Sequence, residues 1–313
     1  TGVGAIIGQG IVRCLRDANR AVRIVGVDRN PECFGPLLCD AFCAKPDVDE
    51  SEMAYIRFWE NLLAEESVDL VLPGIEEDMF FLSAHREVLS ERTVLGLNTP
   101  ALIDLARDKW RLAEVAGAMT IPASLSRNWD ECVAKLGPAP LLLKPRQGSG
   151  SRGIVRLENE TDFAYWAGRA EANFMVQKIV GTDEQEFTVG LFGLGEGRTV
   201  TPPILFRRRL SPAGNTQYAE VVNDEALAAV TQALAERLQP VGPTNFQFRK
   251  DNGRIYLLEI NPRFSSSSSL RAAFGYNEGR MALEYYLDGK DPAPPEIRFG
   301  RAWRVAGDRV ELD

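Results

Sequence analysis

The chain has 313 residues, of which 45% are hydrophobic, and a formal net charge of −8 at pH 7. This size and composition predict a globular protein of two or three domains. Because the chain is acidic and has no basic block interleaved with aromatic residues, we expect no nucleic-acid groove. No apolar run reaches the roughly 18 to 20 residues that span a bilayer, and no signal peptide is recognisable, so we predict a cytoplasmic protein without a membrane partner.

The cysteines and the histidine point away from several classes of chemistry. The five cysteines lie among apolar residues. Cys39 and Cys43 could form a metal-binding pair, but no second pair or nearby histidine completes such a site, so we expect reduced thiols. His85 is the single histidine, which excludes a multi-histidine zinc site. Chemistry would therefore depend on acids, amides, lysines, arginines and backbone groups.

The first hundred residues alternate between predicted helices and strands. In chain order we predict helix 8–20, strand 21–27, helix 52–66, strand 69–73, helix 78–89 and strand 93–96. This rhythm is typical of parallel strands joined by crossover helices. Because the chain begins at Thr1 directly on a glycine turn, we expect that a strand preceding this turn is missing from the sequence.

From residue 99 onward the pattern changes toward antiparallel strands. We predict helices 99–120, 129–136, 161–172, 224–238 and 278–287, strands 140–144, 154–157, 174–180, 186–192, 198–209 and 216–222, a polar hairpin around residues 245–261, and a short hairpin at 301–312. The predicted fold class is α/β and α+β. An N-terminal parallel α/β domain (1–98) precedes two lobes (99–180 and 181–313), and the last lobe carries antiparallel sheets.

The polar hairpin carries the strongest chemical signal. Glu259 and Asn261 are two residues apart, so on a strand their side chains leave the same face. A two-residue turn at 252–253 would send Gln247 to the opposite face, whereas a three-residue loop at 251–253 would bring it onto theirs. We predict the three-residue loop. Hard oxygen ligands without thiol or imidazole suit Mg²⁺ or Mn²⁺ held largely by a substrate phosphate. The alternative is a polar strand end that enters an Asn-Pro turn.

Two earlier segments have the composition of nucleotide-binding elements. A buried strand ends in Lys144 and is followed by a glycine- and serine-rich loop at 146–153, whose N–H groups could close on phosphate oxygens. The lysine precedes the glycines, which excludes a Walker A loop but not triphosphate binding. Further on, backbone groups of Lys178 and Val180 could bond an adenine edge, and Glu186 could accept hydrogen bonds from a ribose. A linker and a simple buried hairpin are the alternatives.

The sequence gives less support for residues that would contact the substrate. On a strand Arg207 and Arg209 share a face, and either could clamp a carboxylate or a phosphate, or belong to a solvated edge strand. The serines that follow Arg263 could offer N–H groups at a helix start. Glu76 could meet an amine substrate, although the acidic first turn of a helix is the favoured interpretation.

The glycine-rich segment 1–8, with Asp28 about twenty residues on, looks like a dinucleotide fingerprint. Close packing of a strand against a helix demands the same glycines without any ligand. We therefore expect no NAD.

The order of these pieces resembles the ATP-grasp superfamily, and within it the carbamoyl-phosphate-synthetase-like group of carboxylate–amine ligases. The motifs in order are Asp-Lys at 108–109, Lys-Pro at 144–145 with its glycine loop, the segment 177–180 with Glu186, and Gln247 with 259–263. Several motifs in this order are more specific than any one of them, and the likeness covers nearly the whole chain. Residues 1–98 would then match the family's pre-ATP-grasp domain.

The resemblance implies ATP and Mg²⁺ (or Mn²⁺) as cofactors and assigns roles by position. Residues expected to contact ATP are Lys109, Lys144, Gly148, Ser149, Gly150, Ser151, Gln177, Lys178, Ile179, Val180 and Glu186. Expected metal ligands are Gln247, Glu259 and Asn261, while Arg263, Lys144 and Asn261 would act on the transferring phosphoryl group. Expected substrate contacts are Arg207, Arg209, Ser265, Ser266 and Glu76.

Two positions depart from the family pattern. Many members have a glutamate where this chain has Gln177, which makes nucleotide preference less secure than ATP binding. Many also have an acid at the position of Gln247, so this site has one negative charge fewer, which should weaken a second metal ion.

The implied reaction transfers the γ-phosphoryl group of ATP to a carboxylate, and an amine attacks the resulting acyl phosphate. We therefore predict an ATP-dependent ligase that joins a small carboxylate to an amine, in a family whose members are often homodimers. One alternative is a single-module carbamoyl-phosphate-synthetase relative acting on bicarbonate or carbamate, although the full synthetase resembles two such modules in tandem. Another is a nucleotide-binding regulatory protein without turnover.

Overall fold

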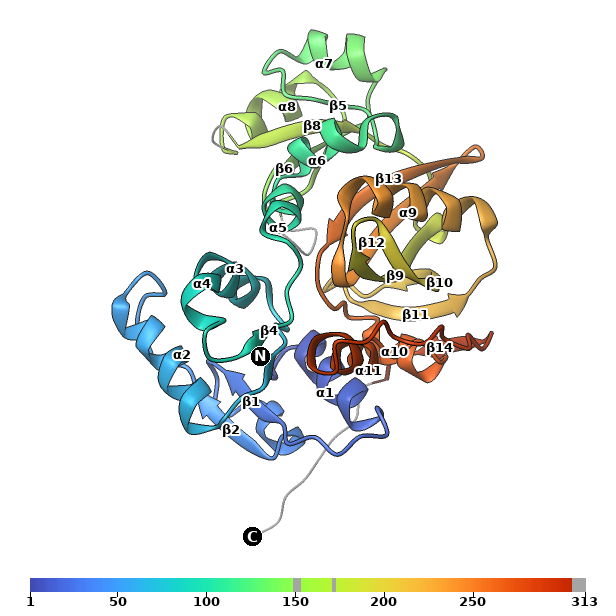
Figure 1. Ribbon diagram of the computed structural model, residues 1–313. Helices are drawn as coiled ribbons and strands as arrows, with labels where there is room; N and C mark the ends of the chain where they lie inside the picture. The colour runs from blue at the N-terminus through green and yellow to red at the C-terminus, as the bar shows by residue number, and fades with distance from the viewer. Residues whose placement is uncertain (149–152, 171–172, 306–313) are drawn as a thin grey trace.

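The computed structural model describes residues 1–148, 153–170 and 173–305 (Figure 1). Its helices and strands fall into three groups along the chain. In Figure 1 the first group lies at the lower left, the second at the top, and the third at the right. None of the described helices combines the length and apolar character that crossing a membrane requires.

The first group contains short parallel strands and the helices between them. Its elements are α1 (Ile6–Arg16), β1 (Val25–Asp28), a 3-10 turn (Gly35–Leu38), β2 (Ala41–Ala44), α2 (Met53–Glu65), β3 (Leu70–Val71), α3 (Glu76–Ala84), α4 (Arg86–Leu89) and β4 (Val94–Leu95). Strand β1 pairs with β2, and β3 with β4, in both cases parallel. Strand β2 was not predicted. The helix predicted over 78–89 is two helices, because His85 leaves helical geometry at φ −107° and ψ 23°.

The glycine turn before α1 packs closely and is held by its own acid. A Cβ atom at Gly8 would lie 2.1 Å from the carbonyl oxygen of Gly2, so the turn requires glycine there. The backbone N–H of Gly4 donates to Asp28 Oδ2 at 2.7 Å. Packing and this hydrogen bond account for the glycines and the acid without a ligand.

The second group is a small antiparallel sheet covered by two helices. Its elements are α5 (Pro100–Arg107), α6 (Lys109–Ala116), a 3-10 turn (Gly117–Met119), β5 (Ala123–Ser124), α7 (Trp129–Leu136), β6 (Leu141–Pro145), β7 (Val155–Leu157), α8 (Glu160–Ala167) and β8 (Phe174–Lys178). The strand order is β5-β8-β6-β7. The single helix predicted over 99–120 is divided at Asp108, whose extended backbone lets its carboxylate cap α6 by accepting from Trp110 N at 2.9 Å.

The third group is built on a six-stranded antiparallel sheet. Its elements are a 3-10 turn (Asp183–Gln185), β9 (Glu186–Gly195), β10 (Arg198–Leu210), β11 (Thr216–Val221), α9 (Glu225–Leu238), β12 (Val241–Asp251), β13 (Arg254–Asn261), α10 (Ser268–Ala273), α11 (Glu278–Ala282) with a π-helical turn (Leu283–Leu287), and β14 (Arg301–Trp303). The strand order is β13-β12-β9-β10-β11-β14. Strand β14 pairs with β11. Residues 306–312 of the hairpin predicted at 301–312 lie outside the described residues, so that hairpin stays a prediction.

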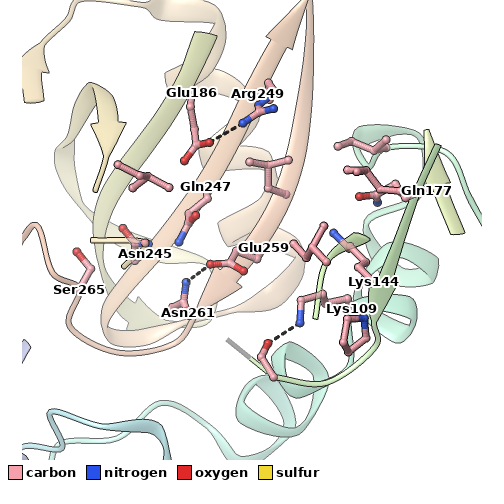
Figure 2. A pocket seen from close by; sticks show the side chains of 18 of the residues that line it. Lys109, Lys144, Gln177, Glu186, Asn245, Gln247, Arg249, Glu259, Asn261 and Ser265 are labelled. Carbon is pink, nitrogen blue, oxygen red and sulfur yellow. Dashed lines mark hydrogen bonds and ion pairs between the residues drawn. The ribbon is translucent and has the colours of Figure 1, made fainter. Parts of the chain in front are cut away.

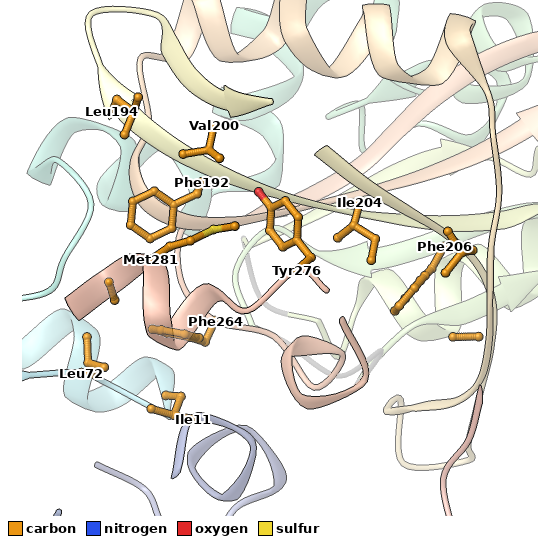
Figure 3. Packing of buried hydrophobic residues seen from close by; sticks show 13 residues of the cluster. Ile11, Leu72, Phe192, Leu194, Val200, Ile204, Phe206, Phe264, Tyr276 and Met281 are labelled. Atoms are coloured by element: carbon orange, nitrogen blue, oxygen red, sulfur yellow. The ribbon is translucent and has the colours of Figure 1, made fainter. Parts of the chain in front are cut away.

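One hydrophobic core joins the first group to the third. Ile11 of α1 and Leu72 after β3 pack with Phe192, Phe264 and Met281 from the third group (Figure 3). Helices α10 and α11 lie against α1, which fixes the N-terminal elements relative to the sheet that carries the polar hairpin.

A fully buried ion pair fastens these helices to the sheet. Arg271 of α10 donates to Glu278 Oε1 of α11 at 2.9 Å, and both side chains have 0% exposure. The same guanidinium donates to Thr188 Oγ1 at 3.1 Å and to Asn245 Oδ1. A Cβ atom at residue 190 would lie 2.7 Å from this guanidinium, so Gly190 provides the space that the arginine fills.

We expect Glu278→Leu to be strongly destabilising, by about 3–5 kcal/mol, because it leaves the buried charge of Arg271 uncompensated. The double variant Arg271→Met/Glu278→Leu should lose less stability, since Thr188 and Asn245 still bond each other at 2.6 Å. Urea unfolding of the variants would measure both changes. Asp291→Ala, which removes the exposed partner of Arg198, is the control and should cost less than ~1 kcal/mol. Equal losses in the single and double variants would contradict the expectation.

Candidate active site

A cavity of about 340 Å³ lies between the small sheet and the six-stranded sheet (Figure 2). Strands β6 and β8 and the start of α6 line one side, and β10, β12 and β13 line the other. Fourteen of the residues that the sequence singled out line this cavity: Lys109, Lys144, Gly148, Gln177, Lys178, Ile179, Val180, Glu186, Gln247, Glu259, Asn261, Arg263, Ser265 and Ser266. Ser149, Gly150 and Ser151 lie outside the described residues.

The polar hairpin has the predicted pairing of polar residues, but its connecting turn differs from the predicted one. The connection is a two-residue turn in which Asn252 and Gly253 both have positive φ, at 48° and 78°, and not the predicted three-residue loop. A regular ladder from this turn would pair Gln247 with Leu258. A β-bulge intervenes instead, and Gln247 pairs with Glu259. The predicted shared face of Gln247, Glu259 and Asn261 therefore exists, because one extra residue resets the alternation.

Glu259 and Asn261 are already oriented toward each other. Asn261 donates from Nδ2 to Glu259 Oε1 at 3.1 Å, and its Oδ1 accepts from Arg263 Nη2 at 3.2 Å. Among the described residues, no group of three or more His, Cys, Asp or Glu side chains could hold a metal ion. A carboxylate and an amide oxygen fit Mg²⁺ only if phosphate oxygens or waters fill most of its coordination shell, which is how Mg²⁺ usually binds beside a nucleotide.

Two lysines face this acid across the cavity. Lys144, near the end of β6, is 7% exposed. Burial lowers the pKa of its amine to about 8, although the nearby Glu259 carboxylate opposes that change. Burial likewise lowers the pKa of Lys109, whose Nζ donates to the carbonyl oxygen of Gly148 at 2.6 Å. Both amines therefore gain from an anion in the cavity.

The start of α6 anchors the glycine loop. The backbone N–H of Lys109 donates to the carbonyl oxygen of Arg146 at 2.9 Å, and the Arg146 guanidinium forms an ion pair with Asp108. Gly148 has φ +107°, which favours glycine at the point where the loop turns away from β6.

Segment 177–180 borders the cavity where a base was predicted to bind. Gln177 is buried, and Ile179 and Val180 line the cavity. The N–H of Lys178 is already donated to the carbonyl oxygen of Pro122 at 3.0 Å, which leaves the Lys178 carbonyl and the backbone of Val180 for a base edge.

Arg207 and Arg209 of β10, which were predicted as possible substrate contacts, point away from the cavity. Arg207 forms an exposed ion pair with Glu220, and Arg209 lies over the ring of Tyr218, 4.6 Å from its centroid. Neither side chain lines the cavity, whereas Arg208 between them does. Strand alternation correctly placed Arg207 and Arg209 on one face, but that face is the outer one.

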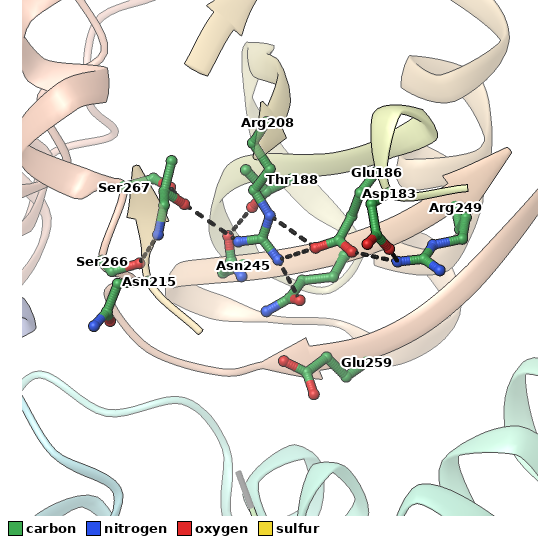
Figure 4. Close-up of polar contacts among 12 residues, drawn as sticks. Asp183, Glu186, Thr188, Arg208, Asn215, Asn245, Arg249, Glu259, Ser266 and Ser267 are labelled. Carbon is green, nitrogen blue, oxygen red and sulfur yellow. Dashed lines mark hydrogen bonds and ion pairs between the residues drawn. The ribbon is translucent and has the colours of Figure 1, made fainter. Parts of the chain in front are cut away.

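Arg208 is also the partner that the sequence did not assign to Glu186. Its Nη2 donates to Glu186 Oε1 at 2.9 Å, and Arg249 Nη2 donates to Glu186 Oε2 at 2.7 Å (Figure 4). Both carboxylate oxygens are therefore engaged by arginines, and a ribose hydroxyl would have to share them. The sequence indicates this pairing only by placing three consecutive arginines in one predicted strand and an acid in the strand before it.

Of the other predicted substrate contacts, Ser265 and Ser266 line the cavity, and Glu76 lies beside it. Arg263 Nη2 forms an ion pair with Glu76, which is the first residue of α3. Glu76 lines an adjoining cavity together with Lys109 and Glu259, rather than the main one. Ser265 Oγ accepts from Ser267 N at 3.0 Å, so hydroxyls of the serine run already satisfy part of its backbone before α10 begins at Ser268.

Comparisons with known proteins agree on the superfamily. A family model described as ATP-grasp in the biosynthetic pathway with Ter operon matches residues 171–306. The carbamoyl phosphate synthase large chain of Clostridium beijerinckii is 25% identical over 296 residues, covering 83% of this chain and 26% of that protein. A probable alpha-L-glutamate ligase of Stenotrophomonas maltophilia is 26% identical over 244 residues, covering 72% of this chain and 80% of that protein.

Solved structures show the same fold. The biotin carboxylase domain of Hydrogenobacter thermophilus 2-oxoglutarate carboxylase, in complex with MgADP and bicarbonate, superposes with TM-score 0.72 at 17% identity, covering 95% of this chain and 71% of that chain. An N5-carboxyaminoimidazole synthetase from Staphylococcus aureus complexed with ADP also has TM-score 0.72 at 17% identity, covering 94% of this chain and 78% of that chain.

Residues 171–306 thus match an ATP-grasp model, and the relatives and the shared fold support the ATP-grasp superfamily. The predicted mixed fold with antiparallel sheets is confirmed as the one shared with ATP-grasp biotin carboxylase structures. The chain spans about a quarter of the length of the carbamoyl phosphate synthase large chains, at 26% and 28%.

We expect anion binding in the ATP-grasp cavity to weaken at alkaline pH. Below its pKa of about 8 the Lys144 amine is charged and attracts phosphate, and above that pKa it is neutral. The dissociation constant for ATP should therefore change little below neutral pH and rise by up to about tenfold per pH unit above the pKa, until the higher pKa of the complex is passed. Titrations with a fluorescent ATP analogue at several pH values would measure this.

Lys144→Met is the matched variant for that titration. It should bind ATP more weakly at neutral pH, and its dissociation constant should depend less on pH. Lys109 would account for the pH dependence that remains. A wild-type affinity that stays constant through alkaline pH would show that Lys144 does not act through its charge.

Proposed function

We propose that this protein is an ATP-dependent ligase that joins a small-molecule carboxylate to an amine through an acyl phosphate, with Mg²⁺ on the ATP phosphates. The observation that carries the proposal is the composition of one cavity. Lys109 and Lys144 line one side, and Glu259, Asn261 and Arg263 line the other. Cations opposite oxygen ligands are the arrangement that in-line phosphoryl transfer between two anions needs.

Each group has a place in the proposed reaction. The backbone of Lys178 and Val180 binds the adenine, and Lys109 and Lys144 bind the phosphates. Glu259 and Asn261 would hold Mg²⁺, and a bound Mg²⁺ would supply positive charge beside the phosphates. Arg263 orients the carboxylate acceptor beside that group. Because an acyl phosphate hydrolyses readily, the proposed reaction requires that water be excluded from the cavity.

Regions 1–98, 99–180 and 181–313 are proposed as a pre-ATP-grasp domain and the two ATP-grasp lobes. The ion pair between Glu76 and Arg263 supports a contribution of the first region to the acceptor site, because it joins α3 to the end of the polar hairpin. The solved neighbour in complex with bicarbonate makes that anion a candidate carboxylate beside amino acids and dipeptides.

We expect ADP release, with Mg²⁺ and ATP present, to be stimulated by at least one acceptor pair from a panel of amino acids, dipeptides and bicarbonate. Glu259→Ala should reduce this stimulated rate by at least about 100-fold, since a charge stabiliser of the transition state is lost. Glu220→Ala, which removes an exposed acid paired with Arg207, should leave the rate unchanged. A coupled assay for ADP, with phosphate counted in parallel, measures all three proteins.

The pattern of stimulation distinguishes the candidate functions. Turnover that requires a specific acid and amine together supports the ligase, and turnover with bicarbonate supports the carbamoyl-phosphate-synthetase-like alternative. ATP binding with no ADP formation on any acceptor would favour a regulatory protein. Absence of ATP binding would overturn the proposal.

A further inference from the structure

Arg263 is a cation whose present partners use its donors incompletely. Its Nη2 donates to Glu76 Oε1 and also, at 3.2 Å, to Asn261 Oδ1, and its Nη1 donates to the carbonyl oxygen of Phe264 at 2.9 Å. Its Nε is buried and has no hydrogen-bond partner in the described part of the chain. A buried N–H without a partner costs free energy, so this guanidinium would gain from an acceptor that also reaches Nε.

Glu76 binds this guanidinium through one oxygen. Among the described residues, only its Oε1 accepts a hydrogen bond from Arg263, and its side chain keeps 22% of its surface exposed. A carboxylate binds an arginine more strongly when it accepts two parallel N–H bonds, either from Nη1 and Nη2 or from Nε and Nη2. Both arrangements need Nη2, whose two N–H groups already donate to Glu76 and Asn261. A free carboxylate therefore binds Arg263 in this way only by displacing one of them.

The ion pair joins residues of two neighbouring cavities. Arg263 lines the ATP-grasp cavity, and Glu76 lines the adjoining cavity of about 620 Å³. Lys109, Glu259 and Asn261 line both cavities. Because these three residues belong to the phosphate end of the proposed site, a carboxylate on Arg263 would lie close to the phosphates of ATP.

We infer that Glu76 occupies the place of the acceptor carboxylate on Arg263 in the free protein and is displaced when that carboxylate binds. This inference rests on the proposed function, because it names the residue that a carboxylate substrate replaces. The exchange converts a single contact into a bidentate one. Glu76 leaves rather than Asn261, because two carboxylates on one guanidinium repel each other, whereas the amide is neutral.

The exchange has a consequence for the choice of substrate. Glu76 is the first residue of α3, so its side chain can turn into the adjoining cavity while the helix stays in place. Until it does so, it competes with every carboxylate that reaches Arg263. Only an acceptor that makes further contacts in the cavity then binds well, and simple carboxylates are disfavoured.

The test uses acetate, the simplest carboxylate probe, and measures its binding by the rise in the unfolding temperature of the protein. Acetate replaces chloride at constant ionic strength, with MgADP present to occupy the phosphate end of the cavity. We expect Glu76→Gln to bind acetate about tenfold more tightly than the wild type, because a neutral amide holds the guanidinium less strongly than a carboxylate does. Glu77→Gln removes the same charge from the adjoining cavity and leaves the ion pair of Arg263 in place. It should change the dissociation constant for acetate by less than about threefold, since exposed charges are screened.

In an Arg263→Met background, Glu76→Gln should no longer tighten acetate binding, because the guanidinium for which the two carboxylates compete is gone. Equal acetate affinities of the wild type and Glu76→Gln would overturn the inference. An equal gain in Glu77→Gln would overturn it too, because it would show an effect of charge alone.

If Glu76→Gln does not fold, Glu76→Asp decides. It keeps the charge but reaches less far toward Arg263, so it should also bind acetate more tightly, and an unchanged affinity would contradict the inference. A wild type whose unfolding temperature does not rise with MgADP would instead count against the proposed function, while the acetate affinities would still decide the role of Glu76.

Discussion

The candidate site depends on one extra residue in β13. The two-residue turn at 252–253 fixes the alternation of the hairpin, and on its own that alternation would turn Gln247 away from Glu259. The bulge at Leu258 changes the alternation halfway along the strand. On the turn side Phe248 and Leu257 stay paired and buried, and beyond the bulge the polar residues share the cavity face. The half of the hairpin next to the turn therefore packs in the hydrophobic core, and the half beyond the bulge lines the site.

Contacts between the three groups of elements complete the site, and each uses a polar side chain at a chain connection. Asn98, in the link after β4, accepts from Val241 N at 2.7 Å and donates to Thr244 Oγ1 at 3.0 Å. Glu76 pairs with Arg263 at the far end. Within the second group, Asp108 pairs with Arg146 and so ties the glycine loop to α6. These bonds therefore fasten the first group to the sheet that carries the acid, and the loop to the helix that carries Lys109.

Much of this arrangement could be predicted from local pattern, and the failures have physical causes. The order of motifs identified half of the residues that line the cavity, 14 of 28. Period-two alternation placed Arg207 with Arg209, but it cannot tell which face of a strand points inward. The bulge could not be foreseen, because residue alternation alone does not show where an extra residue enters a strand. The break at Asp108 was hidden by helical periodicity on both sides of it.

The cations around the cavity divide into two kinds, and the division bears on how the site would respond to an anion. Arg208, Arg249 and Arg263 each meet a carboxylate, which fixes their positions and offsets their charge. In the described part of the chain, Lys109 and Lys144 form no ion pair, and burial lowers the pKa of both. The arginines therefore have fixed positions, whereas the two lysines are partly desolvated and are compensated only in part by the nearby Glu259. Nucleotide phosphate supplies that compensation, so the free energy of desolvating two lysines becomes part of the affinity of the site for ATP.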